Sequence, residues 1–139
     1  MYIDKQNSFC SSQAVTASAP STDYIDLGAA RDIGVSDGLQ VLITVNTTAT
    51  AAGAATVAFS LEKDSSSAFG SAVAVTSTAA IGKATLVAGY QFYLPIPIGT
   101  DARYLRVYFT VATGPLTAGA FSAAIVKGEQ KNISYADAI

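Results

Sequence analysis

Hydrophobic and polar residues alternate with a period of two through four segments of the chain. Successive side chains of a strand point to opposite faces of its sheet, so this period indicates strands with one buried face. β-Branched and aromatic residues, which suit a half-buried pleated surface, fill these segments. We therefore predict strands over Leu39–Val45, Thr56–Lys63, Tyr104–Val111 and Phe121–Ile125.

Four further segments alternate less clearly, and we predict weaker strands there: Ala14–Ala17, Tyr24–Leu27, Ala72–Thr76 and Gln91–Pro95. Proline donates no ladder hydrogen bond, so Pro95 and Pro97 end the last strand or place it at a sheet edge. Ala84–Ala88 fits either a single helical turn or a short strand. No segment shows a convincing helical period.

Eight short strands separated by polar turns predict an all-β fold, an antiparallel β-sandwich, with a jelly roll favoured over an immunoglobulin-like order. The length of 139 residues predicts one domain over 1–139. The inward positions of the two sheets predict a core, which consists of Val41, Ile43, Phe59, Leu61, Phe92, Leu105, Val107, Phe109, Phe121 and Ile125.

Both ends of the chain are more polar than its middle and show no clean alternation. We interpret 1–12 as an N-terminal arm and 129–139 as a C-terminal tail. Terminal segments of this kind are loosely ordered unless a partner holds them. Deletion of 1–12 is therefore expected to weaken binding to a partner and to leave the fold intact.

Charged residues make up 13% of the chain, against about 25% in an average globular domain. Such a composition fits either a weakly charged exterior or an exterior that lies against partners. The net charge is −2, and the eight basic residues are scattered along the chain. Nucleic acids and anionic membranes are bound by clustered basic residues, so we expect neither as a partner.

The chain has no histidine and one cysteine, Cys10. Catalytic triads that use histidine and zinc sites of the usual kind are thereby excluded, and we expect Cys10 to be an inert thiol. A pair of carboxylates could still hydrolyse glycosides, but Asp23, Asp26 and the Glu62–Asp64 segment are typical of turns and solvated faces. We expect no enzyme activity, no cofactor and no metal.

We expect no signal peptide in the first residues, because residues 4–7 are polar and would interrupt its apolar segment. No segment has the ~20 strongly apolar residues of a transmembrane helix. We expect a soluble protein that is made in a cytoplasm.

Tyr104, Arg106 and Tyr108 share the outward face of one predicted strand. Tyrosine and arginine are enriched in the centres of protein interfaces, so these residues are candidates for a contact surface. A solvent-exposed face with cross-strand aromatic pairs explains the same pattern. The start of the arm supplies three further candidates, Met1, Tyr2 and Ile3.

The sequence resembles the capsid cement, or decoration, proteins of short-tailed bacteriophages, a family typified by a Bordetella phage protein. The resemblance lies in the order and spacing of short motifs along most of the chain. These are Met1-Tyr2, Asp4–Gln6, Gln13–Thr16, Ile25–Gly34, Thr50–Ala55, Arg103–Arg106, Thr110–Pro115 and Thr117–Ala120. The tail after Glu129 matches least.

This resemblance implies a jelly-roll virion protein, paired as a homodimer, on the outer surface of an icosahedral capsid of HK97-type major capsid proteins. There it would clamp neighbouring capsomers after the shell expands. It would be synthesised in the cytoplasm of a bacterial host. Because the same fold serves many functions, a receptor- or carbohydrate-binding module of a phage fibre is the alternative.

Overall fold

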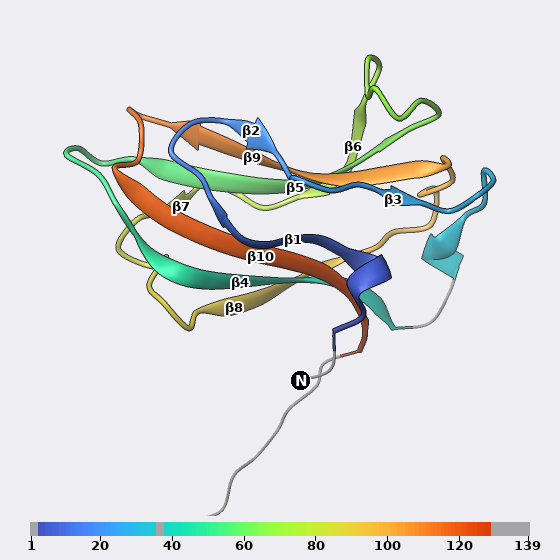
Figure 1. The fold of residues 1–139 in the computed structure, drawn as a ribbon, viewed down its shortest axis with the longest axis horizontal. Coiled ribbons are helices and arrows are strands. Elements are labelled where there is room, and N and C mark those ends of the chain that lie inside the picture. Colours follow the sequence, from blue (N-terminus) through green and yellow to red (C-terminus); the bar gives the residue numbers. More distant parts are fainter. Residues whose placement is uncertain (1–2, 36–37, 129–139) are drawn as a thin grey trace, which may run out of the picture.

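The computed structural model describes residues 3–35 and 38–128 and shows two β-sheets packed face to face (Figure 1). Two short 3₁₀ helices, η1 and η2, lie outside the sheets. The helices and strands are η1 (Lys5–Asn7), β1 (Ser8–Ala14), β2 (Ala19–Pro20), β3 (Ile25–Asp26), η2 (Ile33–Val35), β4 (Leu39–Thr50), β5 (Thr56–Asp64), β6 (Val73–Ser77), β7 (Ile81–Gly82), β8 (Gln91–Pro95), β9 (Tyr104–Ala112) and β10 (Ala118–Lys127). No helix in the described parts of the chain is long and apolar enough to cross a membrane.

Within residues 3–35 and 38–128, all strand pairs are antiparallel and form two sheets. Sheet A has the order β1-β10-β4-β8, and sheet B has the order β2-β9-β5-β6, with β3 also on β9 and β7 also on β5. β2 and β3 both pair with β9, and β6 and β7 both pair with β5, so each of these two pairs is counted as one strand position of sheet B. When the eight resulting positions are numbered in chain order, sheet A has the order 1-8-3-6 and sheet B has the order 2-7-4-5. This is the strand order of a jelly roll. The predicted sandwich is confirmed, and its connectivity is the favoured one.

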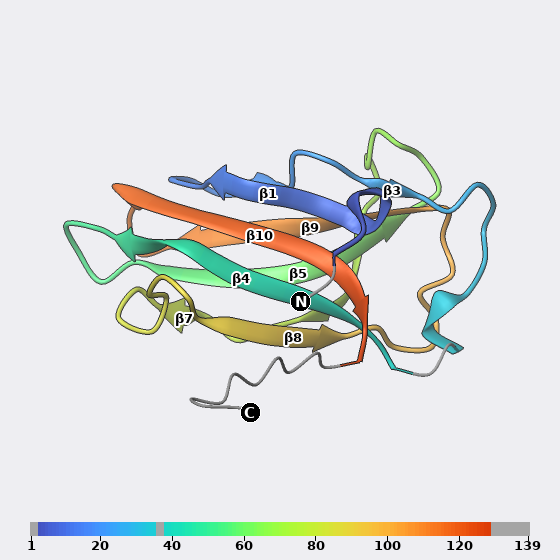
Figure 2. The ribbon, with the colours of Figure 1, turned by 60° about the horizontal axis from the view of Figure 1, so that its bottom comes forward.

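The four most regular segments of the sequence are strands in the structure (Figure 2), as β4, β5, β9 and β10. β10 and β4 lie side by side in the middle of sheet A, and β9 and β5 do the same in sheet B. Each of these strands therefore has a paired neighbour on both sides and one face against the core, which gives the clean period of two.

Only some of the weaker strand predictions agree with the structure. Gln91–Pro95 is β8 at an edge of sheet A, as its prolines indicate, and Ala72–Thr76 is β6 shifted by one residue. The predicted strand over Ala14–Ala17 is wrong, because β1 ends at Ala14 and the next strand begins at Ala19. Ala84–Ala88 is neither helix nor strand: the chain makes hydrogen-bonded turns there.

The core lies between the sheets and includes the predicted residues. Eight of the ten have essentially no exposed surface, while Phe92 and Ile125 are partly buried and pack against the others. Phe59 is at the centre of an aromatic cluster. The centroid of its ring lies 5.1 Å from that of Phe92, 5.6 Å from that of Phe109 and 5.2 Å from that of Phe121.

The predicted N-terminal arm over 1–12 is wrong from Ser8 onwards. Residues 8–12 belong to β1, which pairs with β10, and both Phe9 and Cys10 are buried in the core. The ladder between β1 and β10 has two register shifts, one before and one after Cys10. Such bulges place two residues opposite one, and they hid the period of two in the sequence. Met1, Tyr2 and the predicted tail over 129–139 lie outside the described residues.

The link between β3 and β4 packs tightly on the link between β8 and β9. The carboxylate of Asp32 accepts hydrogen bonds from the backbone N–H groups of Gly34 (2.9 Å) and Gly99 (2.8 Å). A Cβ atom on Gly34 would lie 1.8 Å from the carbonyl oxygen of Pro97. Only glycine therefore fits at this crossing of two backbones.

Candidate interaction surface

The outer face of sheet B carries the three predicted interface residues of β9. Tyr104, Arg106 and Tyr108 are partly exposed there, while the residues between them are buried in the core. The prediction that the three side chains share one outward face is confirmed. Their role in binding a partner stays a prediction.

Arg106 is held in place by neighbours on this face. Its Nε donates to the carboxylate of Glu62, the residue opposite on β5, at 2.7 Å, and the two side chains are only 18% and 16% exposed. Its guanidinium lies 4.6 Å from the ring centroid of Phe69 and 5.3 Å from that of Tyr108. Cation–π contacts of this kind and the ion pair fix the orientation of the guanidinium.

The loop between β5 and β6 brings Phe69 onto this face. Asp64, at the end of β5, accepts hydrogen bonds from the backbone N–H groups of Ser66 (3.0 Å) and Ser71 (2.8 Å), so its carboxylate ties the two ends of the loop together. These hydrogen bonds lower the pKa of Asp64 from its ordinary value. The backbone of Phe69 has a φ of 53°, and its ring lies over the guanidinium of Arg106. The residue is only 9% exposed there.

Two further side chains extend the face towards β3. The ring of Tyr24, which is 50% exposed, makes edge-on contacts with Tyr104 at 5.6 Å and Phe69 at 6.1 Å. Arg103 and Asp26 form a two-pronged ion pair, at 2.7 and 3.0 Å, and the guanidinium lies 5.0 Å from the Tyr104 ring. The hydrogen bond from Arg103 is the main cause that lowers the pKa of Asp26.

We call this surface the aromatic–arginine face; it consists of Tyr24, Phe69, Arg103, Tyr104, Arg106 and Tyr108. Each of its two arginines is paired with a carboxylate. The face therefore offers rings and fixed hydrogen-bonding groups without an excess of positive charge. Such a surface is typical of contacts with proteins rather than with polyanions.

Sequence reasoning found only half of this face. Tyr24, Phe69 and Arg103 were not predicted to join the residues of β9. Tyr24 comes from a separate edge of the sheet, and Phe69 reaches the face through a loop whose shape depends on Asp64. Neither arrangement leaves a periodic pattern in the sequence.

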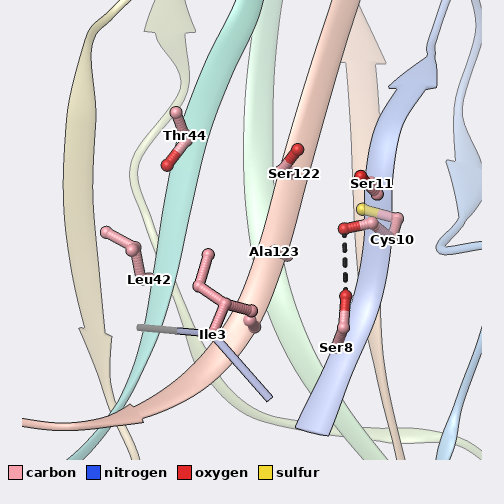
Figure 3. Close-up of a pocket in the computed structure, with 9 residues that line it drawn as sticks. Ile3, Ser8, Cys10, Ser11, Leu42, Thr44, Ser122 and Ala123 are labelled. Carbon is pink, nitrogen blue, oxygen red and sulfur yellow. Dashed lines mark hydrogen bonds between the residues drawn. The ribbon is translucent and has the colours of Figure 1, made fainter. Parts of the chain in front are cut away.

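A shallow groove of about 80 Å³ lies on the outer face of sheet A (Figure 3). It follows β10 where the side chains of Ser122 and Ala124 are small, between β1 and β4. Ile3, which is 51% exposed, lies over β10 beside Leu42. The structure thus places Ile3 on the opposite side of the sandwich from the aromatic–arginine face, and the predicted interface residues do not form one surface.

Cys10 borders the groove but is buried. Its side chain is part of the hydrophobic core, and its Sγ lies 3.5 Å from the backbone oxygen of Phe121, to which it donates. Burial raises the pKa of the Cys10 thiol to about 11. These properties support the expectation of an inert thiol, because the thiolate is the reactive form.

The carboxylates considered for catalysis have structural contacts. Asp26 pairs with Arg103 and accepts from the N–H of Gly28, and Glu62 pairs with Arg106. Asp23 faces Lys5 in an exposed ion pair at 3.4 Å. These carboxylates thus stabilise turns or form ion pairs, as expected from their positions in the sequence.

The strand order, the core and the two outer surfaces define this chain as a jelly-roll β-sandwich with an ordered aromatic–arginine face. A family model described as Bbp16 matches residues 9–125, and the chain belongs to the Bbp16 family. The match begins in β1 and ends in β10, so it includes both sheets. It is consistent with the resemblance to a protein family of a Bordetella phage. No curated protein matches the chain.

Proposed function

We propose that this protein is a structural virion protein that binds the outside of a phage capsid and cements neighbouring major capsid protein subunits of the HK97 type. In this role it acts as a homodimer and stabilises the expanded shell. The observation that carries the proposal is the ordered aromatic–arginine face on a chain of the Bbp16 family.

A cement protein needs contact surfaces that are already ordered before it binds. Tyrosine rings supply a large contact area at a low cost in conformational entropy, and most binding energy at interfaces comes from a few such residues and arginines. On this face the rings of Tyr24 and Tyr104 support each other, and Arg106 is fixed by Glu62 and Phe69. Binding would therefore order few additional side chains.

The groove on sheet A supplies a second surface on the other side of the molecule. Ile3 lies over it, and the predicted contact residues Met1 and Tyr2 precede Ile3 in the chain. Each contact of a cement protein can be weak, since a protein that bridges two subunits gains from effective concentration. We assign the aromatic–arginine face the main contact and the N-terminal residues an additional one.

Co-sedimentation with expanded capsids that lack the protein tests this assignment. Tyr24→Ser removes the most exposed ring of the face, and we expect it to weaken capsid binding about tenfold or more, as for a residue at the centre of an interface. Tyr90→Ser is the matched control, because Tyr90 is 37% exposed and lies next to β8 in sheet A. Equal binding of both variants and the unchanged protein would remove the face from the proposal.

A receptor- or carbohydrate-binding module of a phage fibre is the second candidate. The half-exposed ring of Tyr24 favours it, because sugars stack on exposed aromatic rings. A glycan array with the purified protein separates the two functions. Glycan binding that Tyr24→Ser abolishes, together with no binding to expanded capsids, would replace the cement proposal.

A further inference from the structure

The guanidinium of Arg106 is only partly used by the ion pair that holds it. Its Nε donates to the carboxylate of Glu62 at 2.7 Å, and in the described part of the chain neither of its Nη atoms donates a hydrogen bond. Arg103, by contrast, donates to Asp26 from both Nε and Nη2. Arg106 therefore keeps the N–H donors of its Nη atoms available to a partner.

The neighbouring rings orient these donors without using them. The centroids of the Phe69 and Tyr108 rings lie 4.6 and 5.3 Å from the guanidinium carbon of Arg106. A cation–π contact uses the π face of the ring, whereas the N–H donors of a guanidinium lie in the plane of that group. The side chain of Arg106 is only 18% exposed, so packing restricts its conformation. Its Nη donors are thus held in place before a partner binds.

The tyrosines of the same face add further donors. The side-chain hydrogen bonds of this face run from its arginines to carboxylates, and in the residues that the structure describes none involves the hydroxyl of Tyr24, Tyr104 or Tyr108. A tyrosine hydroxyl can donate to an acceptor of the partner. The ring of Tyr24 is 50% exposed and gives such a partner an apolar contact beside the donors. The face is therefore rich in donors and lined by aromatic rings.

The charge balance of the face favours a neutral acceptor over an anionic one. Arg103 is matched by Asp26, and Arg106 is matched by Glu62. A carboxylate that bound the Nη atoms of Arg106 would share this arginine with Glu62, and the two like charges would repel each other. A neutral acceptor meets no such repulsion. The main-chain carbonyl is the neutral acceptor that nearly every residue of a protein partner carries.

We propose that the aromatic–arginine face binds an extended, uncharged segment of the partner protein, and that a main-chain carbonyl of this segment accepts from the Nη atoms of Arg106. This inference rests on the proposed function and names the ligand chemistry of its main contact. Carbonyls are available where a segment has no internal backbone hydrogen bonds, as in the polyproline II conformation. Surfaces lined by aromatic rings recognise such segments, because a preformed extended chain loses little conformational entropy on binding.

Two small probes separate a neutral ligand from an anionic one. Capped hexaproline is an uncharged polyproline II peptide with free carbonyls, and acetate supplies a carboxylate. Nuclear magnetic resonance of the arginine Nε–H groups follows both titrations, with the exposed Arg31 as the internal reference. We expect hexaproline to shift the Arg106 signal in a saturable way and acetate to shift it no more than that of Arg31. No hexaproline shift at Arg106, or an equal or larger saturable shift with acetate, would overturn the inference.

Glu62→Gln gives a readout that a purely structural ion pair would not change. The amide oxygen still accepts from Nε of Arg106, but the negative charge is removed, so the affinity for acetate should rise about tenfold or more. An unchanged response to acetate would contradict the role of charge in selecting the ligand.

The double variant Arg106→Gln/Glu62→Gln removes the guanidinium without leaving a carboxylate unpaired. We expect it to abolish the hexaproline response, read from the ring signals of Tyr24, and to weaken co-sedimentation with expanded capsids about tenfold. A thermal unfolding curve confirms that the variant is folded. Capsid binding that the double variant leaves unchanged overturns the inference alone, whereas hexaproline binding by a protein that does not bind capsids refutes the proposed function alone.

Discussion

Two nested truncations of the N-terminus separate binding by the first residues from the stability of the sandwich. Deletion of 1–7 removes Ile3, which is 51% exposed, and η1, which has no buried residue. It also removes the exposed ion pair of Lys5 with Asp23, a type of contact worth about 0–1 kcal/mol. We expect this truncation to change the free energy of unfolding by no more than about 1 kcal/mol.

Deletion of 1–12 has a much larger expected effect, because it also removes most of β1. Phe9 has no exposed surface, and the loss of a buried phenylalanine costs about 3–5 kcal/mol. Cys10 and the hydrogen bonds of β1 with β10 are lost as well. Since a domain of this kind has a total stability of about 5–15 kcal/mol, the loss removes a large part of it or prevents folding.

Urea unfolding followed by far-ultraviolet circular dichroism measures both effects. Phe9→Ala in the full chain checks the magnitude if the longer truncation does not fold, and its unfolding free energy should fall by about 3–5 kcal/mol. Equal urea midpoints for the two truncations, or a change below about 1 kcal/mol for Phe9→Ala, would refute the placement of β1 in sheet A.

Three further predictions concern the loops, the acid range and the thiol. Gly34→Ala should lower the unfolding free energy by about 3 kcal/mol or more, because its Cβ would overlap the backbone of Pro97; a loss below about 1 kcal/mol in urea unfolding would contradict the close approach. The folded-state pKa values of Asp26 and Asp64 lie below the ordinary value of 3.8, so their contribution to stability is complete above about pH 4 and is lost as the pH falls through the lowered values. Thermal unfolding should therefore show a falling melting temperature below that pH, with a shallower fall for Asp64→Asn; an unchanged slope in this variant would show that the carboxylate does not tie the loop. Cys10 should react with a thiol reagent at pH 8 only after unfolding, because the rise of its pKa from 9.0 to about 11 reduces the thiolate roughly 100-fold, and rapid labelling of the native protein would contradict its burial.

The regular parts of the fold could be predicted because burial on one face leaves a clear pattern. β4, β5, β9 and β10 have paired neighbours on both sides, so their alternation runs without interruption. β1 was missed because its two bulges break the alternation around Cys10. β2 has two residues, too few for any pattern to show.

The candidate surface was predictable only where it follows one strand. Tyr104, Arg106 and Tyr108 are separated by two positions each, so the period of β9 places them together. Phe69 joins them through a loop held by Asp64, and Tyr24 joins them from another edge of the sheet. Contacts of that kind depend on tertiary packing, which a local pattern does not contain.

The rupture temperature of expanded capsids, measured with and without the purified protein, tests the cement role most directly. We predict saturable binding to shells that lack the protein and a rupture temperature that rises with occupancy. Absence of binding to matched, expanded shells, or binding that leaves the rupture temperature unchanged, would contradict the role as a capsid cement protein.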